Sequence, residues 1–325
     1  MVAAEPKQNL KISVAVLTRQ RPRMLAELIK SFGHMELPEN CEVRCLIVEN
    51  DKEPNTKDLV YSLFPLPNGL EVDYVLETDL GIPQARNRAA REALESRADV
   101  MTFVDDDEIV DEHWLSELVS SYRMGGCSLI GGPVRITLQD KNLSWIERSM
   151  YNGVQKHFEK LEAKANASTK ENPQPVVTNN WLADVSLFGY ENIWFDESLR
   201  FTGGSDSKFF RDVTTKGFKS RWNPDAIVYA VMPKDRLSFW DQFRTARDRT
   251  MNRFHLVLKN RKAAKVRLLF SVPIKVMVIT ALVIAVPFTR GKTLYGVART
   301  AGWVVGRIGA AFGGKSKLYT KILGN

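Results

Sequence analysis

Three adjacent aspartates, Asp105, Asp106 and Asp107, directly follow the apolar run Val100–Val104. Ionised carboxylates this close repel one another, so water, a cation or a helix N-terminus must compensate their charge. Carboxylate oxygens are the ligands that Mg²⁺ and Mn²⁺ prefer, and the bound ion can bridge to substrate phosphates. The pattern Asp105-x-Asp107 therefore predicts a divalent-cation site for a phosphorylated ligand.

Helix capping and calcium binding account less well for this acidic run. Asp111 can cap a helix that begins at Glu112, but helix capping does not account for the three aspartates before it. A calcium loop of the EF-hand type is excluded because Val110 stands where that loop needs glycine, and Ser116 stands where it needs glutamate.

A further carboxylate, Asp206, follows Gly203-Gly204. The glycines predict a tight turn, and a helix is expected over 207–215, with Gly217 after its end. Asp206 can then be the N-cap of this helix or a base that reaches a substrate hydroxyl, and the two roles are compatible.

The elements that must position these residues follow a regular alternation over residues 10–136. Short β-branched runs are expected to be strands, and each is followed by a helical pattern. The expected strands are 12–17, 43–48, 72–76 and 100–104, and the expected helices are 24–32, 56–64, 83–97 and 112–122. This repetition predicts an α/β fold with a mostly parallel sheet flanked by helices.

Polar residues stand at the carboxyl ends of three of these strands: Thr18-Arg19, Glu49-Asn50-Asp51 and Asp105–Asp107. Ligands of open α/β sheets bind at this edge, so the three groups are expected to share one site. The first strand is followed by TRQRPR and not by G-x-G-x-x-G, which argues against a dinucleotide. Beyond residue 136 we expect a helix over 145–162 and a loop over 163–175.

Charge divides the chain. Its net charge is +8, yet residues 256–325 hold 13 Lys and Arg and no acid, which leaves 33 basic and 38 acidic residues before them. We therefore expect a catalytic domain over 1–255 and a basic, apolar, helical region over 256–325 that associates with a membrane. A tail helix packed on the catalytic domain is the alternative, but it leaves the absence of acid unexplained.

The apolar run 268–288 is long enough for a transmembrane helix. Lys275, Pro273 and Pro287 inside it favour an in-plane or re-entrant segment that is held by anionic headgroups. Further along, residues 309–316 match the phosphate-loop pattern G-x-x-x-x-G-K-[ST], but no strand precedes them, so we expect Lys315 to lie at a lipid surface instead.

Cysteine number and the N-terminus bear on localisation. The three cysteines, Cys41, Cys45 and Cys127, are an odd number without a paired framework, which favours a reducing compartment. The N-terminus MVAAEPKQNLKISV lacks the features of a signal peptide. We expect a protein on the cytoplasmic face of the inner membrane, peripheral or monotopic.

Several segments together resemble family 2 glycosyltransferases, which have the GT-A fold, and within them the bacterial succinoglycan-type exopolysaccharide glucosyltransferases. The resemblance covers residues 10–255 well and the remainder loosely. The segments occur in this order: SVAVLTRQRPRMLAELIKSF, ENDKE, ETDLGIPQARNRAAREA, FVDDDEIVDEHWLSELV, GGPV, GGSDSKFFRDVTTKGF, PDAIVY and PKDRLSFWDQFRTARDR.

The resemblance implies roles for individual residues. Asp105 would lie near the nucleotide ribose and, with Asp107, at Mn²⁺ or Mg²⁺, while Asp206 would be the catalytic base of an inverting displacement. The implied nucleotide-sugar contacts also include Thr18, Arg19, Asp51, Arg86 and Asp106. Contacts to the donor sugar or acceptor are implied for Asn179, Asn180, Trp181 and Gly204, although Trp181 can equally be a core residue.

Two positions depart from the family pattern. Ser205 stands where many relatives have glutamate, and Ala230 stands where many have a metal-binding histidine. His255 is a conceivable substitute ligand, but a single histidine in an amphipathic helix more often packs or meets solvent.

The expected activity is transfer of a sugar, glucose from UDP-glucose, to a polyprenyl-linked saccharide at an anionic membrane surface. A metal-dependent nucleotidyltransferase, or another nucleotide-phosphate enzyme, also needs carboxylates at strand ends and stays open. A nucleic-acid-binding module is disfavoured because the basic region lacks the alternation of aromatic and basic residues that single-strand binders use.

Overall fold

The computed structural model of the chain describes residues 9–167, 179–200, 203–260 and 268–314. The chain forms two compact units. The first contains the described residues up to Arg135 and from Leu161 to Val231, and the second contains Ile136–Lys160 and the described residues of 232–321. Their limits do not fall at residue 255, and the functional division expected there stays a prediction.

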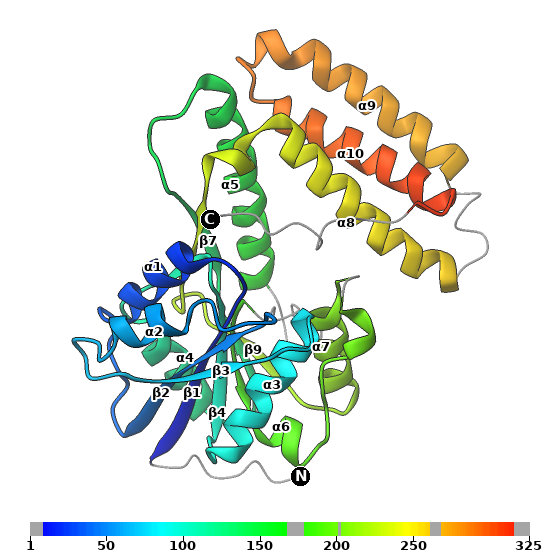
Figure 1. Cartoon of the computed structure of the whole chain (residues 1–325). Helices are drawn as coiled ribbons and strands as arrows, with labels where there is room; N and C mark the ends of the chain where they lie inside the picture. The colour runs from blue at the N-terminus through cyan, green and yellow to red at the C-terminus, as the bar shows by residue number, and fades with distance from the viewer. Residues whose placement is uncertain (1–8, 168–178, 201–202, 261–267, 315–325) are drawn as a thin grey trace. The chain divides into compact units, whose positions relative to one another are not determined.

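A seven-stranded sheet is the centre of the first unit (Figure 1). Its order is β3 (Glu71–Leu76), β2 (Cys41–Glu49), β1 (Leu10–Thr18), β4 (Val100–Asp105), β8 (Asn180–Asp184), β6 (Leu129–Gly131) and β9 (Ser220–Trp222). The first four strands are parallel, and β8 is antiparallel to both β4 and β6. The predicted α/β fold with a mostly parallel sheet is confirmed.

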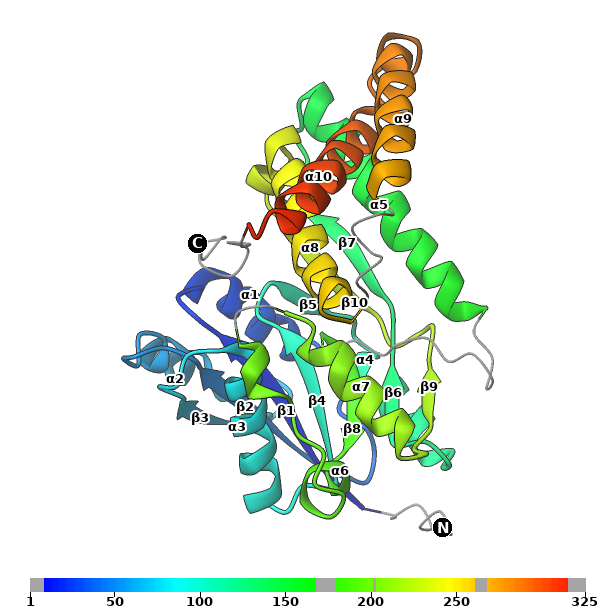
Figure 2. The ribbon, with the colours of Figure 1, turned by 90° about the vertical axis from the view of Figure 1, so that its right-hand side faces the viewer.

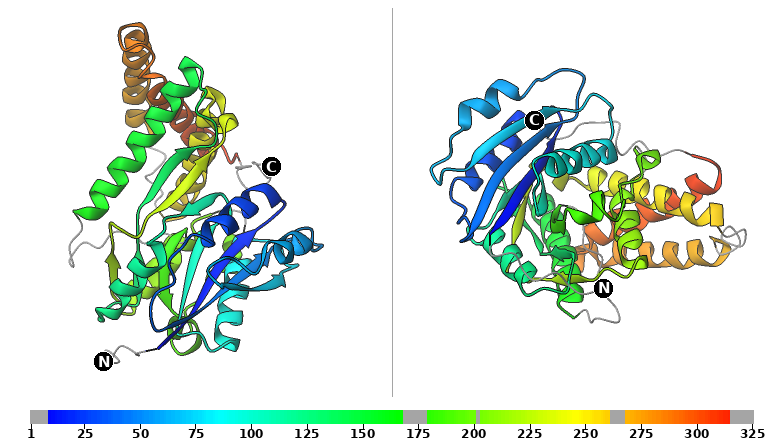
Figure 3. Two further views of the ribbon diagram at one scale, coloured as in Figure 1. Left: turned by 90° about the vertical axis from the view of Figure 1, so that its left-hand side faces the viewer. Right: turned by 90° about the horizontal axis from the view of Figure 1, so that it is seen from below.

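Helices cover both faces of this sheet (Figures 2 and 3). One face is covered by α1 (Pro22–Phe32), α2 (Lys57–Leu63) and α4 (Trp114–Arg123), and the other by α3 (Ile82–Glu95), α6 (Ser186–Gly189) and α7 (Ser205–Thr215). The strands are apolar on both sides because helices bury both.

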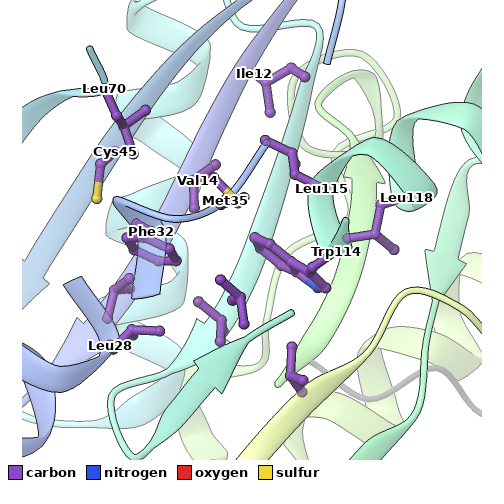
Figure 4. Close-up of a cluster of buried hydrophobic side chains, with 14 of the residues drawn as sticks. Ile12, Val14, Leu28, Phe32, Met35, Cys45, Leu70, Trp114, Leu115 and Leu118 are labelled. Carbon is purple, nitrogen blue, oxygen red and sulfur yellow. The ribbon is translucent and has the colours of Figure 1, made fainter. Parts of the chain in front are cut away.

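The side chains of β1 alternate between the two faces of the sheet, and each face has its own hydrophobic core. Val14 and Val16 face α1 and α4, whereas Ala15 faces the core that α3 closes. Figure 4 shows the first core, where Phe32 of α1 and Trp114 of α4 lie over the sheet.

A three-stranded sheet with the order β5 (Glu108–Val110), β10 (Val228–Met232) and β7 (Val134–Leu138) lies beside the turn that follows β4. In the antiparallel pairing of β10 with β5, Ala230 is opposite Glu108. The N–H of Val231 donates to the carbonyl of Asp107 at 3.0 Å. This pairing fixes the backbone of the aspartate turn.

The second unit is helical. It contains the first part of α5 (Trp145–Asn166), α8 (Phe239–Asn260), α9 (Leu268–Phe288) and α10 (Leu294–Ala311). Glycines let α10 approach α8 closely: a Cβ on Gly302 would lie 2.4 Å from the Phe243 carbonyl oxygen, and one on Gly306 would lie 2.3 Å from that of Arg247. Among the described residues, one helix is long and apolar enough to cross a membrane, Phe270–Phe288.

Several predicted boundaries change. The helix expected from Glu112 begins at Trp114, and Asp111 accepts a hydrogen bond from the N–H of His113 at 3.3 Å. α5 continues to Asn166, so the expected loop over 163–175 is wrong for its first residues, and 168–178 lie outside the described residues. Residues 309–311 end α10, and the N–H of Gly314 donates to the Gly309 carbonyl, which is a helix C-terminus and not a phosphate loop. Lys315 and Ser316 lie outside the described residues.

Candidate active site

The carboxyl ends of β1, β2 and β4 lie side by side at one edge of the sheet. Parallel pairing places Thr18 beside Glu49 and Leu17 beside Asp105. The three polar groups expected to share a site are therefore brought together by strand register.

Asp106 points into the protein. It is buried, and its carboxylate accepts hydrogen bonds from Thr18 Oγ1 at 2.9 Å and from Arg21 Nη1 at 2.8 Å. Burial raises the pKa of Asp106, while the Arg21 guanidinium opposes this shift. Asp106 and Thr18 thus hold the turn in place. The Thr18 hydroxyl donates to the Asp106 carboxylate, so the two side chains bind each other.

Asp105 and Asp107 supply the remaining carboxylates of the turn. Burial raises the pKa of Asp105 to about 7, with the Asp107 carboxylate raising it further and Arg86 opposing the shift. Asp107 Oδ2 lies 3.6 Å from Arg21 Nη1. Neighbouring ionised carboxylates repel each other, and a bound cation relieves this repulsion. Asp105 and Asp107 therefore form a candidate cation site.

Glu108 is committed to structure. Its Oε2 accepts from the N–H of Asp105 at 2.9 Å, and its Oε1 accepts from Asn179 Nδ2 at 2.9 Å. Burial raises its pKa well above the usual range, and the Asp105 carboxylate adds to this shift. The Glu108 carboxylate therefore stabilises the backbone of the aspartate turn and holds the Asn179 side chain next to this turn.

The residues present fit a divalent cation that is shared with a ligand. Within the described ranges, no group of three or more His, Cys, Asp or Glu is placed to hold a metal ion by itself. Asp105 and Asp107 can contribute two carboxylates, and Mg²⁺ sites commonly combine one or two carboxylates with substrate phosphates and water. Ala230, opposite Glu108, contributes no ligand.

Residues at the carboxyl end of β2 form a second side of the candidate site. Glu49 is buried and accepts from both the N–H and the hydroxyl of Thr56, at 2.9 and 2.7 Å, which anchors the start of α2. Asp51 accepts from Gln20 Nε2 at 2.7 Å and from the N–H of Lys52 at 2.8 Å. The predicted nucleotide residue Asp51 therefore lies against the segment that follows β1.

Asn50 clamps the loop between β3 and α3, a role that the sequence alone did not reveal. Its Nδ2 donates to the carbonyls of Glu77 and Asp79, at 3.0 and 2.9 Å, and its Oδ1 accepts from the N–H of Gly81 at 2.8 Å. Gly81 starts α3, the helix that carries Arg86. One buried amide thus ties the β2 end to the helix that carries a predicted phosphate contact.

Arg86 connects α3 with the start of α7. Its Nη1 donates to Ser205 Oγ at 3.1 Å, and its positive charge lowers the pKa of Asp105. Since Ser205 precedes Asp206, this guanidinium lies between the aspartate turn and the predicted base. Ser205, which stands where many relatives have glutamate, therefore contributes a hydroxyl that accepts a hydrogen bond from Arg86.

Asp206 is the second residue of α7. The helix begins at Ser205, and its N-cap is Gly204 with φ 91°, so the hypothesis that Asp206 is the N-cap is wrong. Its Oδ1 accepts from the N–H of the next residue, Ser207, at 2.8 Å, on the exposed surface. A Cβ added at Gly204 would meet nothing within 4 Å, so the space above this turn is open.

A second link, also unforeseen, joins the segment before α7 to the β3–α3 loop. Arg200 donates through two nitrogens to the Asp79 carboxylate, both at 2.9 Å. Asn87 Nδ2 donates to Glu197 Oε1 at 2.8 Å. Because paired donors fix orientation, these bonds hold Glu197 and Arg200 against α3 and the loop that precedes it.

Two residues predicted to contact sugar have buried side chains, and their contact with a sugar stays a prediction. Trp181 is 1% exposed and stacks on Phe103 with 5.6 Å between ring centroids, so it is a core residue. Asn180 is buried; its Oδ1 accepts from Trp114 Nε1, and its Nδ2 donates to the carbonyls of Pro133 and Ala226, all at 2.8 Å. Their side chains are engaged inside the protein.

Two further predicted residues differ in their surroundings. Arg19, after β1, has a buried Nε without a hydrogen-bond partner in the described part of the chain, which leaves a donor for a ligand acceptor. His255 lies in α8 of the second unit, and its Nε2 is 2.7 Å from the Gly314 carbonyl oxygen. His255 therefore has a structural partner within the second unit.

Comparisons with known proteins identify a family and related folds. The sequence model of the family described as "Glycosyl transferase family 2" matches residues 13–188. Succinoglycan biosynthesis protein ExoM of Rhizobium meliloti (strain 1021) is 29% identical over 238 residues, which are 72% of this chain and 71% of that protein.

Two solved structures share the fold. Mannosyltransferase PcManGT from Pyrobaculum calidifontis, in complex with GDP-Man and Mn²⁺, is similar with a TM-score of 0.59 and 15% identity, over 96% of this chain and 90% of that one. TarS 1-349 of S. aureus, in complex with UDP, is similar with a TM-score of 0.50 and 18% identity. That match covers 75% of this chain and 65% of the TarS chain, just under two thirds of its length.

Proposed function

The chain belongs to glycosyl transferase family 2, and from this premise we propose that it is an inverting, metal-dependent hexosyltransferase of exopolysaccharide synthesis. Its proposed donor is a nucleotide-diphospho-sugar, UDP-glucose, and its proposed acceptor is a polyprenyl-linked saccharide. The observation that supports this most is the link from the aspartate turn through Arg86 to Ser205, next to Asp206. It supports the proposal because Arg86 contacts Ser205, next to the candidate base Asp206, and acts on Asp105 of the candidate metal site.

Asp105 and Asp107 would hold Mn²⁺ or Mg²⁺ together with the donor diphosphate. When bound, the cation supplies Lewis-acid neutralisation of the charge on the departing nucleoside diphosphate. Arg86 and the unpartnered Nε of Arg19 would add charge-assisted hydrogen bonds to phosphate oxygens. Asp51 would contact the nucleoside, in agreement with its place at the end of β2.

Asp206 would act as the general base. Its carboxylate accepts one local N–H bond and lies beside the open space over Gly204, so it can accept a proton from an acceptor hydroxyl. That oxygen would form the new bond to the anomeric carbon while the bond to the diphosphate breaks on the opposite side, which inverts the configuration.

The described helices of the second unit support the membrane part of the proposal. Large apolar side chains of α9 are exposed: Phe270, Ile274, Met277, Ile284 and Phe288. Lys275 is turned from this surface, because its Nζ lies 5.8 Å from the centroid of the Trp303 ring on α10. The exposed surface of α9 is thus apolar, as a helix in contact with lipid requires.

We therefore propose that the region after residue 255 associates with the cytoplasmic face of the inner membrane. Anionic headgroups would attract the basic residues around α9, and the acceptor lipid would be reached from the same membrane. The position of Lys275 beside the Trp303 ring removes one argument against a span of the bilayer by α9.

Product analysis tests the activity. The full chain with Mn²⁺, UDP-glucose and a polyprenyl-diphosphate-linked saccharide should release UDP and yield an extended lipid, whereas release of pyrophosphate would indicate nucleotidyl transfer. Asp206→Asn should abolish turnover and keep UDP binding. The matched control is Asp212→Asn on the same helix, whose carboxylate pairs with Lys208 at 2.6 Å. Equal activity of the two variants would remove Asp206 from the mechanism.

A further inference from the structure

A basic cluster on the second unit lies where α5, α8 and α10 meet. The contact between α5 and α10 is close at Gly153, because a Cβ there would lie 2.2 Å from the Tyr295 ring. One turn further along each helix come His157 and Arg299, and the Arg299 guanidinium carbon lies 5.6 Å from the Tyr295 ring centroid. This packing brings an imidazole and a guanidinium together on adjoining helices.

Helix α8, which packs along α10 at Gly302 and Gly306, carries two more cations. Arg249 and Arg253 are exposed and are one helical turn apart. Burial lowers the pKa of His157, and four positive charges lower it further: Arg299, Arg249, Arg253 and Lys160. Arg299 and Arg249 likewise oppose the raised pKa of Tyr295, whose main cause is burial. Positive charges on α5, α8 and α10 therefore act on the imidazole of His157.

Three of these cations have no carboxylate partner among the described residues. No ion pair there joins Lys160, Arg253 or Arg299 to an acidic side chain. The nearest acids along the helices are Glu159, which is exposed on α5, and Asp248, which is buried and paired with Arg247 at 2.9 Å. Like charges held close together are stabilised when an anion binds between them.

We propose that His157, Lys160, Arg249, Arg253 and Arg299 form a binding site for the diphosphate group of the acceptor lipid. This inference rests on the proposed function, because it assigns the headgroup of the lipid-linked acceptor to a place in the chain. The same helical unit exposes the apolar side chains of α9, so a lipid could place its chain and its headgroup on one unit.

The charge of the cluster favours a diphosphate over a phospholipid headgroup. Lysine and arginine contribute four positive charges around His157. A polyprenyl diphosphate linked to sugar carries two ionised phosphates, whereas phosphatidylglycerol carries a single one. Arginine suits this role because its guanidinium can donate two parallel hydrogen bonds to phosphate oxygens.

The test compares two charge-matched variants of the full chain in flotation with vesicles. The site variant is Arg253→Gln with Arg299→Gln, and the control is Lys57→Gln with Arg97→Gln, two exposed basic residues of the first unit. One vesicle preparation contains phosphatidylcholine with a low fraction of polyprenyl diphosphate, and the other contains phosphatidylglycerol at equal total charge. Inorganic pyrophosphate is the soluble competitor.

We expect the site variant to bind polyprenyl-diphosphate vesicles at least about tenfold more weakly than wild type, while the control changes by less than about threefold. Pyrophosphate should displace the wild-type chain from diphosphate vesicles and leave its binding to phosphatidylglycerol vesicles nearly unchanged. Equal losses for both variants, or equal binding of wild type to both vesicle types, would overturn the proposal in favour of general surface attraction.

Titration with UDP and Mn²⁺ separates this result from the proposed function. The site variant should bind UDP as wild type does, which also shows that the first unit is folded. If wild type bound diphosphate vesicles through the cluster but released no UDP from any donor, the transferase proposal would fail and the lipid site would stand. If it transferred sugar while the site variant kept wild-type lipid binding, only the lipid site would fail.

Discussion

The buried pair of Arg21 and Asp106 should determine whether the aspartate turn is held in place. Asp106 accepts from Arg21 Nη1 at 2.8 Å and from Thr18 Oγ1 at 2.9 Å, and its side chain is 5% exposed. Replacing Arg21 with methionine keeps most of the apolar stem but leaves this carboxylate with one partner. We therefore expect both the stability of the first unit and the geometry of Asp107 to suffer.

The size of the effect follows from burial. Breaking a fully buried ion pair by removing one partner costs about 3–5 kcal/mol. The Arg21 side chain is 23% exposed, and Asp106 can take up a proton, so we expect about 2 kcal/mol. For a unit of this size that lowers the melting temperature by about 4–8 °C.

Thermal unfolding followed by circular dichroism measures this shift, with Arg23→Met as the matched control. Arg23 is exposed in the first turn of α1, two residues after Arg21, so its replacement should change stability by less than about 0.5 kcal/mol. In the Asp106→Asn background the Arg21→Met change should cost about 1 kcal/mol or less, because no buried charge is left. Equal melting temperatures of the Arg21→Met and Arg23→Met variants would refute the reasoning.

Three further substitutions probe other parts of the site. Asn50→Ala removes three hydrogen bonds to the β3–α3 loop, so UDP affinity by calorimetry should fall about tenfold with the fold retained by circular dichroism; unchanged affinity would contradict the clamp. Trp181→Phe should cost about 1–3 kcal/mol in unfolding yet leave KM for donor and acceptor unchanged, because the ring packs on Phe103; a raised KM with unchanged stability would restore a sugar contact. Ala230→His adds an imidazole opposite Glu108, so Mn²⁺ affinity by electron paramagnetic resonance should rise about tenfold; no gain would place the cation away from β10.

Most of the parallel half of the fold could be predicted because its pattern is local. The expected strand over 100–104 is β4 (Val100–Asp105), and the expected apolar run over 268–288 is α9 with the same bounds. The start of α7 was misplaced because a glycine in the left-handed region, Gly204, caps the helix where a side-chain cap at Asp206 was expected. Backbone geometry of this kind leaves little signal in residue type.

Candidate site residues could be predicted where residues able to bind phosphate or metal follow the end of a strand. Contacts between segments that are distant in the sequence could not be predicted. Asp106 and Asp107 lie in the turn after β4, where strand alternation no longer fixes side-chain direction, so the inward position of Asp106 could not be inferred from the strand pattern. The burial of Trp181 depends on β8 pairing antiparallel with β4, which sets it opposite Phe103. Nothing in the local sequence predicts that register, or the bond from Arg200 to Asp79.

The central claim is that Asp105 and Asp107 bind a nucleoside diphosphate through a divalent cation. Isothermal titration of the full chain with UDP, first with Mn²⁺ and then with EDTA, tests it most directly, with Asp107→Asn as the variant and Asp111→Asn as the control. We predict binding that requires Mn²⁺, is lost in Asp107→Asn and is kept in Asp111→Asn. Binding of equal strength in EDTA, or an unchanged affinity of Asp107→Asn, would contradict the claim.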